Sequence, residues 1–340
     1  MDNLFTDSVD RLFAQAVTPQ VIRAIEAGGS RDALWQELEE SGFLDALLPE
    51  ASDGAGLSLT DAFPLFLLAG QYAVPVPFVQ TMLARAWLNA AGVKAPAGAI
   101  TIAAFGVRKD AQSLNADAVP FGRVADWVLT HNQDGCVLLP VAAAQSVSVA
   151  SHGSLNANLR WNQLPADAVT IAPAALPDID LAGLAAASYA PLLAGAANRV
   201  LELTLDYANQ RVQFGKNIGR FQAVQSQISV MAERTWAARM AAALACQGNG
   251  WAPGHLGAAV GKCRCSEAAV HVADIGHAVH GAIGITEEYD LQLYTRRLRE
   301  WRMAAGTETY WAGQIGARLL QQSGHTALSF ICAELSAVQA

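Results

Sequence analysis

The spacing of the apolar residues changes twice along this 340-residue chain, and this change limits the possible folds more than any other feature. From Asp7 to about Gly92 the apolar residues recur at helical spacing. Between about Ala99 and Ala175 the chain consists of short β-prone runs separated by Asp, Asn, Gly and Pro. From about Ile179 to the end the helical spacing returns in long stretches. The sequence therefore predicts a helical segment, a β segment and a second helical segment.

The first segment is divided by proline and glycine. Its helical periodicity is clear at Leu34, Trp35 and Leu38, where Asp32 is placed as an N-cap. A loop at Pro49–Gly56 and the Val-Pro-Val-Pro run at 74–77 interrupt the pattern, because proline cannot continue a helix. Three or four helices would fit this segment.

The middle segment is typical of a small antiparallel β-domain, and the last segment of a helical bundle. Leu181–Ala197 is the most apolar long stretch, but it is shorter than the about 20 residues of a membrane span, and we interpret it as a buried helix. The fold class is therefore α+β, mainly α, with domains at 1–97 (helical), 98–177 (β) and 178–340 (four-helix bundle). Helices are expected at about 189–211, 222–247, 257–281 and 307–322.

The formal net charge of −8 argues against a protein that binds nucleic acid or a membrane surface through basic residues. Residues 1–175 contain 9 basic and 17 acidic side chains, whereas residues 176–340 contain 13 of each. An anionic ligand should therefore prefer the second half. Five cysteines without a framework spacing, and an acidic N-terminus without an export signal, indicate a reduced cytoplasmic protein.

Three segments in this order resemble the acyl-CoA dehydrogenase family: Leu47–Gly70, Arg211–Ala232 and His280–Glu308. The resemblance implies an N-terminal helical domain, a middle β-domain and a C-terminal four-helix bundle. It also implies FAD as the cofactor, located across a subunit boundary. The second segment is the most specific, because it contains the family's RxxFGxxxxxxQ element.

Within that element, the resemblance places Arg211 and Phe214 at the diphosphate and adenine end of FAD, and Gln222 near the same cofactor. The residue chemistry agrees, since Arg211 carries a fork of donors suited to a diphosphate, Phe214 offers a ring face and Gly215 permits a sharp turn. A different interpretation stays open, in which Arg211 only caps a helix and Phe214 is a buried aromatic residue.

Two further backbone elements match the family in part. Gly281 and Gly284 correspond to a glycine-rich loop that approaches FAD, although other positions of that loop differ here. Gly306 and Thr307 match the glycine and threonine that follow the family's catalytic position, where the threonine contacts the diphosphate chain. Capping of helix ends would explain both elements equally simply.

The catalytic glutamate of the family is absent from both of its usual positions. That glutamate removes the α-proton of a thioester while the β-hydrogen leaves as hydride to the flavin. The commonest position corresponds to Ala305, and the alternative one to Ala185, counted back from Lys216. A methyl group cannot accept a proton. The family's usual middle-domain motifs are also missing, so no flavin-ring or substrate contact is assigned there.

Other charged residues offer weaker candidates. Glu308 lies about one helical turn beyond Ala305 and could face the same cleft as a displaced base. Structural roles are favoured for Glu287 and Glu288, and for Glu300 as an ion-pair partner. The arginine cluster around Glu300 either forms a solvated face or a subunit contact, or it binds an anionic partner; its members are Arg296, Arg297, Arg299 and Arg302.

Metal binding is not expected. Cys263 and Cys265 form a CxC, and three histidines follow on the same predicted helix, but no complete ligand set is formed. Buried or capping roles are favoured for the histidines, which are His271, His277 and His280.

Two functional hypotheses remain. In the first, the chain is an acyl-CoA dehydrogenase-like flavoprotein that acts on an acyl-CoA thioester, as a homodimer or homotetramer, or as the base-less subunit of a heterotetramer with a glutamate-bearing paralogue. Some relatives that act on steroid side-chain CoA thioesters pair two chains in this way. A second flavoprotein would accept the electrons. In the alternative hypothesis, the chain is a non-catalytic structural or ligand-binding protein that keeps only the fold.

Overall fold

The computed structural model describes residues 2–110, 113–132, 135–322 and 326–335. Capping residues and prolines divide the N-terminal segment into five helices, whereas three or four were expected. Thr18 caps the second helix by accepting from the Val21 amide, and Pro19 starts it. The five are α1 (Asp2–Ala16), α2 (Pro19–Glu26), α3 (Asp32–Glu40), α4 (Leu59–Gln71) and α5 (Phe78–Ala90).

Two details of this segment differ from the expectation. Asp32 is the first residue of α3 and not its cap, which is Arg31 without a side-chain hydrogen bond. The Pro49–Gly56 segment contains a short 3-10 helix, η2 (Glu50–Ser52), and another, η1 (Phe43–Asp45), precedes it. The start of α4 has a complete capping box, in which Ser58 and Asp61 bond each other's backbone amides.

The middle domain consists of two four-stranded sheets, with strand orders β1-β4-β5-β8 and β2-β3-β7-β6. All pairs are antiparallel except β1 and β4, so the prediction of a purely antiparallel domain is wrong for that pair. Side chains from both sheets form one apolar core around Trp161 and Leu139. The strands are β1 (Ile100–Ala103), β2 (Val107–Asp110), β3 (Ser113–Val119), β4 (Trp127–Asn132), β5 (Gly135–Pro140), β6 (Gln145–Ser148), β7 (Ala157–Trp161) and β8 (Val169–Ile171), with η3 (Val141–Ala143) between β5 and β6 and η4 (Pro173–Ala175) after β8.

The C-terminal domain is built on three long antiparallel helices. They are α6 (Leu181–Gln210), α7 (Gln222–Ala245) and α8 (His255–His280), followed by α9 (Leu291–Met303), α10 (Glu308–Gln321) and α11 (Ala327–Leu335). Short hairpins and 3-10 turns connect them: β9 (Val212–Gln213), β10 (Lys216–Asn217), η5 (Ile218–Arg220), β11 (Gly248–Asn249), β12 (Ala252–Pro253) and η6 (Gly281–Ile285). The bundle thus has the expected helices, with α9 and α11 in addition.

Helix α6 is the central element of the molecule. Asp180 caps it by accepting from the Gly183 amide, and it continues through Pro191, so it joins the buried helix expected at Leu181–Ala197 to the helix expected at about 189–211. It is long and apolar enough to span a membrane, but 89% of its most apolar window is buried inside the protein. Gly70 and Gly195 make its crossing with α4 possible, because a Cβ on either would lie 2.2 Å or less from a backbone oxygen of the other helix.

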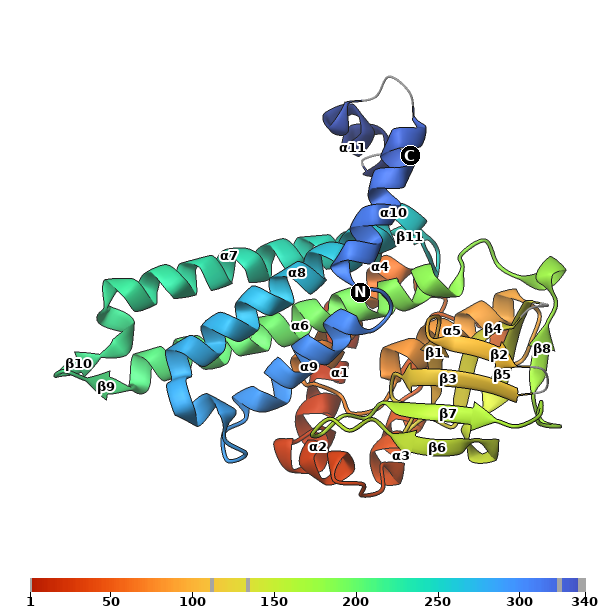
Figure 1. Cartoon of the computed structure of the whole chain (residues 1–340), viewed down its shortest axis with the longest axis horizontal. Coiled ribbons are helices and arrows are strands. Elements are labelled where there is room, and N and C mark those ends of the chain that lie inside the picture. The colour runs from red at the N-terminus through yellow and green to blue at the C-terminus, as the bar shows by residue number, and fades with distance from the viewer. Residues whose placement is uncertain (1, 111–112, 133–134, 323–325, 336–340) are drawn as a thin grey trace.

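The three domains meet along α6 and α9 (Figure 1). The β-domain lies beside one end of the bundle, and the N-terminal helices lie beneath both. The β9–β10 hairpin forms the opposite end of the bundle, while α10 and α11 project away from the body. The expected boundaries at 97/98 and 177/178 lie in the connections between α5 and β1 and between β8 and α6.

Candidate functional site

The RxxFG element forms a tight hairpin at the far end of the bundle (Figure 1). Phe214 and Gly215 occupy the turn between β9 and β10 with φ of 51° and 78°. Two successive residues in the left-handed region match the hairpin turn that fits twisted strands. This turn leaves the Phe214 ring 93% exposed, with its nearest aromatic neighbour, Phe221, edge-on at 6.2 Å. The interpretation of Phe214 as a buried aromatic residue is therefore wrong.

Arg211 and Gln222 lie at the two helix ends that flank this hairpin. The Arg211 amide donates to the Tyr207 carbonyl at 2.8 Å, so its backbone caps α6 as the simpler interpretation expected. Its side chain is exposed, as is that of Gln222, the first residue of α7. The backbone role of Arg211 thus leaves its guanidinium free to face a ligand.

The glycine-rich loop lies at the same end of the bundle. The Tyr207 hydroxyl donates to the His280 carbonyl at 3.4 Å, and the two rings stack at 4.4 Å, which places η6 beside the last turn of α6. Gly281 has φ of 65° and ψ of −144°, a conformation that is essentially restricted to glycine. Gly284 is buried, and a Cβ there would lie 3.0 Å from the His280 and Leu291 side chains. We call Arg211, Phe214, Gln222 and Gly281 the hairpin end.

The position of the missing base lies in a strained turn between α9 and α10. Ala305 and Gly306 have φ of 56° and 84°, and Ala305 is buried. The Trp311 indole donates to the Ala305 carbonyl at 2.8 Å. Thr307 caps α10 by accepting from the Tyr310 amide at 3.4 Å, so the capping interpretation of Thr307 is correct.

The second base position also lies in a packed environment. Ala185 is buried in the first turns of α6. Its neighbours Ala186 and Ala187 pack in one apolar cluster with Trp311, and Phe105 of the β-domain packs against this cluster. Both positions at which the resemblance led us to look for the glutamate therefore hold methyl groups. Trp311 packs with the neighbours of Ala185 and bonds the Ala305 carbonyl. We call residues 185–187 and 304–307 the turn end.

The two ends are too far apart for one cofactor. Arg211 lies 26 positions after Ala185 on the same continuous helix, which at about 1.5 Å per residue separates them by about 40 Å along α6. This distance exceeds the length of one FAD molecule. The hairpin end and the turn end of one chain therefore cannot hold the two ends of the same dinucleotide.

Glu308, the candidate for a displaced base, is the first residue of α10 and forms an ion pair. The Arg302 guanidinium donates two hydrogen bonds to its carboxylate, one of them at 3.1 Å from Nε to Oε2. Burial would raise the pKa of this carboxyl, but the bonds from Arg302 and its own amide outweigh burial and lower the pKa. A general base benefits from a pKa near the working pH, so this geometry favours a structural role.

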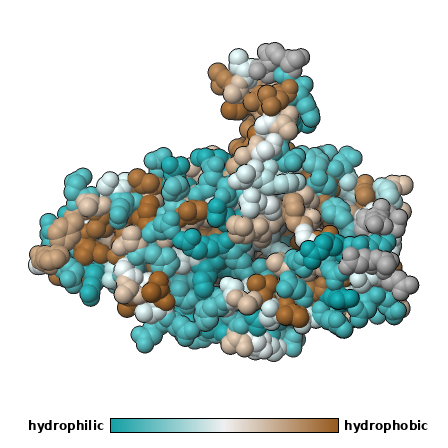
Figure 2. Space-filling view, in the orientation of Figure 1, coloured by the Kyte–Doolittle hydropathy of each residue, from teal (hydrophilic) through white to brown (hydrophobic). Residues whose placement is uncertain are grey.

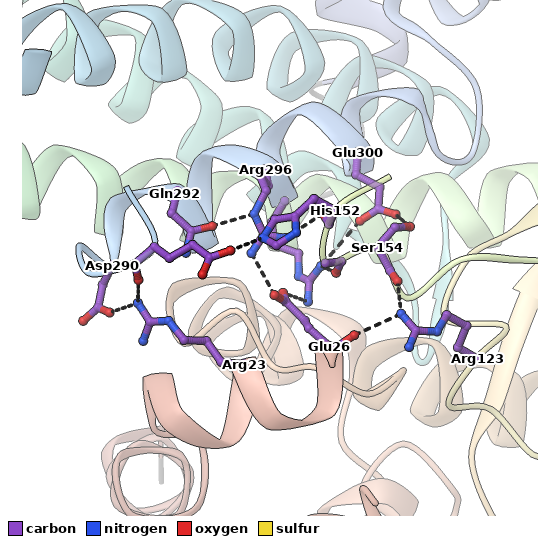
Figure 3. Close-up of polar contacts among 12 residues, drawn as sticks. Arg23, Glu26, Arg123, His152, Ser154, Asp290, Gln292, Arg296 and Glu300 are labelled. Carbon is purple, nitrogen blue, oxygen red and sulfur yellow. Dashed lines mark hydrogen bonds and ion pairs between the residues drawn. The ribbon is translucent and has the colours of Figure 1, made fainter. Parts of the chain in front are cut away.

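Part of the arginine cluster is buried in ion pairs, so the whole cluster is neither a solvated helix face nor a free binding site for a ligand. Arg297 is only 1% exposed and pairs with the Glu26 carboxylate at 2.8 Å, while Arg296 bonds the other oxygen of Glu26 at 2.7 Å (Figure 3). Arg299 forms an exposed pair with Asp274. The expectation of one solvated helix face is wrong, because α9 turns part of this cluster toward α2.

Backbone carbonyls of the β-domain complete this arrangement. The guanidinium groups of Arg296 and Arg297 donate to the His152 and Gly153 carbonyls at 3.0 and 3.3 Å. Arg123 bonds the carbonyls of Glu26 and Ser154, and the Ser154 hydroxyl bonds Glu300 (Figure 3). Glu300 also pairs with Arg297 at 3.5 Å, so its expected role as an ion-pair partner is confirmed. All three domains thus meet here. We call this set the Glu26 network; it comprises Glu26, Arg123, Gly153, Ser154, Arg296, Arg297 and Glu300.

Three cavities of about 410, 350 and 300 Å³ adjoin the Glu26 network, each lined by His152 and Arg296. One of them extends to Ala304, beside the turn end. Carboxylates of Glu26, Glu287 or Glu300 line the same cavities, and only the smallest has as many carboxylates as arginines. In the other two, Arg296 and Arg299 face a single carboxylate, so their lining is net positive. A larger cavity of about 700 Å³ lies among N-terminal residues, and no residue of the hairpin end or the turn end lines it.

The remaining candidates have structural surroundings. Glu287 and Glu288 are exposed, and Glu287 faces His152 at 3.4 Å. His280 is buried and His277 partly buried, each bonded to a neighbour, whereas His271 is exposed against expectation. No group of three potential metal ligands occurs among the described residues. The five cysteines are free thiols, four of them buried.

Comparisons with known proteins agree with this architecture. The model of the acyl-CoA dehydrogenase N-terminal domain matches residues 2–96, and the model of the C-terminal domain matches residues 184–320. The acyl-CoA dehydrogenase IpdE2 of Mycobacterium tuberculosis is 34% identical over 297 residues, which cover 86% of this chain and 89% of the relative.

Two solved structures are similar over nearly the whole chain. The Tcur3481-Tcur3483 steroid ACAD G363A variant has a TM-score of 0.78 and 26% identity, and the match covers 93% of this chain and 96% of that one. The ChsE4-ChsE5 complex from Mycobacterium tuberculosis has a TM-score of 0.76 and 20% identity, with 95% and 98% covered.

Proposed function

Because the chain belongs to the acyl-CoA dehydrogenase family, we propose that it is the flavin-binding, base-less subunit of a mixed acyl-CoA dehydrogenase complex. One observation carries the proposal: the hairpin end keeps its polar and aromatic groups exposed, whereas Ala185 and Ala305 fill both base positions with methyl groups. A chain built in this way can hold a cofactor but cannot remove a proton at its own turn end.

The residues at the hairpin end fit the adenine and diphosphate part of FAD. The exposed Arg211 guanidinium provides two parallel donors, the geometry that a diphosphate accepts. The tight β9–β10 turn holds the Phe214 ring outward, where it can stack on a base. When bound, FAD supplies the acceptor for the hydride that leaves the β-carbon of an acyl-CoA.

The turn end also offers groups that can bind a diphosphate, at the opposite end of the bundle from the hairpin. Thr307 caps the 14-residue helix α10, and its amide and that of Gly306 donate to no described residue. Free amides and the helix dipole at such an N-terminus favour an anion. Since the hairpin end and the turn end of one chain are about 40 Å apart along α6, each end needs another chain to supply the rest of its flavin site.

An exposed apolar surface on α6, α7 and the hairpin is suited to that contact. Trp236 and Met240 are 60% and 65% exposed on α7, and Figure 2 shows hydrophobic residues at the hairpin end of the bundle. Large apolar side chains exposed in this number on neighbouring elements are typical of subunit contacts. Its members include Leu205, Val212, Phe214, Val230, Trp236 and Met240.

The second chain of the proposed complex is a paralogue that carries the glutamate. Both similar structures are named for two protein components, Tcur3481-Tcur3483 and ChsE4-ChsE5, and the first of these structures is a steroid ACAD. By extension, we propose a CoA thioester with a steroid-derived acyl group as the substrate class. The paralogue's carboxylate would remove the α-proton, and this chain would contribute Arg211, Phe214 and Gln222 to the flavin site beside it.

Co-expression with each glutamate-bearing paralogue of the same organism tests the proposal. We expect one of them to co-purify with stoichiometric flavin and to bleach that flavin when an acyl-CoA is added. Replacing the paralogue's glutamate with Gln should abolish bleaching and leave the flavin in place. A chain that binds FAD alone and bleaches it without a partner would refute the mixed complex. If no flavin is bound under any condition, the non-catalytic alternative is correct.

A further inference from the structure

Lys262 is a fully buried charge on α8, in the middle of an apolar helix face. Its side chain is 0% exposed. The Nζ atom donates to the Ser266 hydroxyl at 2.8 Å and to the Arg302 and Gly306 carbonyls at 2.9 Å each. These three acceptors match the three N–H donors of an ammonium group. The sequence of α8 around Lys262 does not indicate a function for this lysine.

The two carbonyls lie on either side of the turn between α9 and α10. Arg302 is in the last turn of α9, where carbonyl groups lack helical partners and the helix dipole is negative. Gly306 immediately precedes Thr307, the cap of α10. One ammonium group therefore links the end of one helix to the start of the next.

The turn needs such support because its backbone is unfavourable. Ala305 is a non-glycine residue with φ of 56°, and Gly306 follows with φ of 84°. A left-handed alanine persists only when its surroundings hold it. The carbonyls of Arg302, Ala305 and Gly306 all accept bonds from buried side chains, Lys262 and Trp311. This use of the carbonyls leaves the amides of Gly306 and Thr307 available.

We propose that Lys262 is a positioning residue that holds the 304–307 turn so that the Gly306 and Thr307 amides can bind the flavin diphosphate. This inference rests on the proposed function for the identity of the ligand. The positioning of the turn itself does not depend on it, because the three hydrogen bonds are present in the chain alone.

The pKa of Lys262 lies close enough to neutral pH for its ammonium group to titrate. Burial lowers its pKa to about 7, although Cys265 and Cys263 on α8 and Glu308 on α10 act in the opposite direction; Arg302 on α9 lowers the pKa further. The ammonium form has a donor for each of the three acceptors, whereas the neutral amine has only two. The turn should therefore be held better below pH 7 than above it.

Hydrogen exchange of the full chain tests the positioning directly. In Lys262→Met we expect the hydrogen-bonded amides beside the turn, those of Ala304, Tyr310 and Trp311, to exchange at least tenfold faster, with little change in the β-domain. Arg264→Met is the matched control, because Arg264 lies two residues away on α8 in an exposed pair with Glu267. Unchanged exchange of these three amides in a folded Lys262→Met variant would overturn the proposal.

Flavin retention by the mixed complex provides the second measurement, with FAD as the probe. We expect the wild-type dissociation constant to rise severalfold between pH 6 and pH 9, and Lys262→Met to bind about tenfold more weakly at pH 6 with a flat profile. A variant that keeps the wild-type pH dependence would overturn the role of Lys262.

The two measurements separate the possible failures. If the chain binds no flavin, FAD binding is absent in wild type and variant alike, while the exchange difference at Ala304, Tyr310 and Trp311 remains. If Lys262→Met does not fold, wild-type exchange of the same three amides, corrected for intrinsic rates, still decides: protection that falls between pH 6 and pH 9 supports the proposal, and pH-independent protection contradicts it.

Discussion

Replacing Glu26 with Gln should destabilise the chain where its three domains meet. The Glu26 carboxylate is 6% exposed and bonds Arg297 at 2.8 Å and Arg296 at 2.7 Å. Gln has nearly the same shape but no charge, so the variant removes the counter-charge and keeps the packing. Arg297, at 1% exposure, would then be a buried cation without its nearest anion.

The expected cost follows from what remains around Arg297. Removing one partner of a buried ion pair costs about 3–5 kcal/mol. Glu300 at 3.5 Å and the Gly153 carbonyl at 3.3 Å still face Arg297, and Arg296 keeps Gln292 and the His152 carbonyl. We therefore expect the lower part of that range, about 3 kcal/mol.

Asp290→Asn provides a matched control with the same acid-to-amide chemistry. Asp290 pairs with Arg23, also on α2, at 2.7 Å, but these side chains are 41% and 32% exposed. An exposed pair contributes about 0.2–1 kcal/mol. The control thus removes a link between the same two helices without leaving a buried charge.

Urea unfolding, followed by circular dichroism and by tryptophan fluorescence, measures both variants. If the free energies of unfolding of Glu26→Gln and Asp290→Asn agree within about 1 kcal/mol, the reasoning is refuted. The double variant Glu26→Gln/Arg297→Met should recover part of the loss, because it also removes the unpaired charge. Without such recovery, the loss would come from packing.

Three further outcomes are expected. In the mixed complex, Arg211→Ala should weaken FAD retention roughly tenfold or more, as the loss of a charge-assisted pair predicts, whereas Arg220→Ala on the neighbouring turn should not; equilibrium dialysis compares them. Glu308→Gln should leave turnover intact. The pKa of Glu308 is lower in the folded state than in the unfolded state, so its ion pair stabilises the protein fully above the unfolded-state pKa. This stabilisation is lost as the pH falls through the folded-state pKa. In acid titrations of stability, the Glu308→Gln variant should therefore lack this pH-dependent contribution. Trp236→Asp should reduce subunit association in sedimentation experiments, because it places a charge on the exposed apolar surface of α7.

The order of the three segments could be predicted because helical and strand periodicity are local properties. Helix α7 begins at Gln222, as predicted, and α8 begins two residues before the predicted start. Helix α6 was predicted as two overlapping stretches, 181–197 and about 189–211, and tertiary packing joins them through Pro191, which is buried within the helix. The parallel β1–β4 pair was missed because the chain crosses to the other sheet between those strands.

The candidate site, like the fold, could be predicted from the sequence only in part. The motif residues could be located from spacing alone, and a 30-residue helix already places Ala185 and Arg211 at opposite ends. The contacts that hold the turn and the domains could not, because they join distant parts of the chain. Glu26 and Arg296 are 270 residues apart, and Lys262 and Gly306 are 44 apart. No local pattern indicates which buried charge will meet which carbonyl.

These buried charges have a common effect on α9. The helix follows the glycine-rich loop at its start and leads into the 304–307 turn at its end, so its position fixes both elements, which belong to two different flavin sites in the proposed complex. The Glu26 network fixes α9 at Arg296 and Arg297, and Lys262 fixes it at the Arg302 carbonyl. Apolar residues of similar volume could stabilise the fold as well as a buried ion pair does. They could not, however, bond the carbonyls at 153, 302 and 306 at once, and these bonds determine where α9 lies. A chain without its own base still has a use for that precision, because the carboxylate of a neighbouring subunit can act only on a substrate and flavin held in a fixed position.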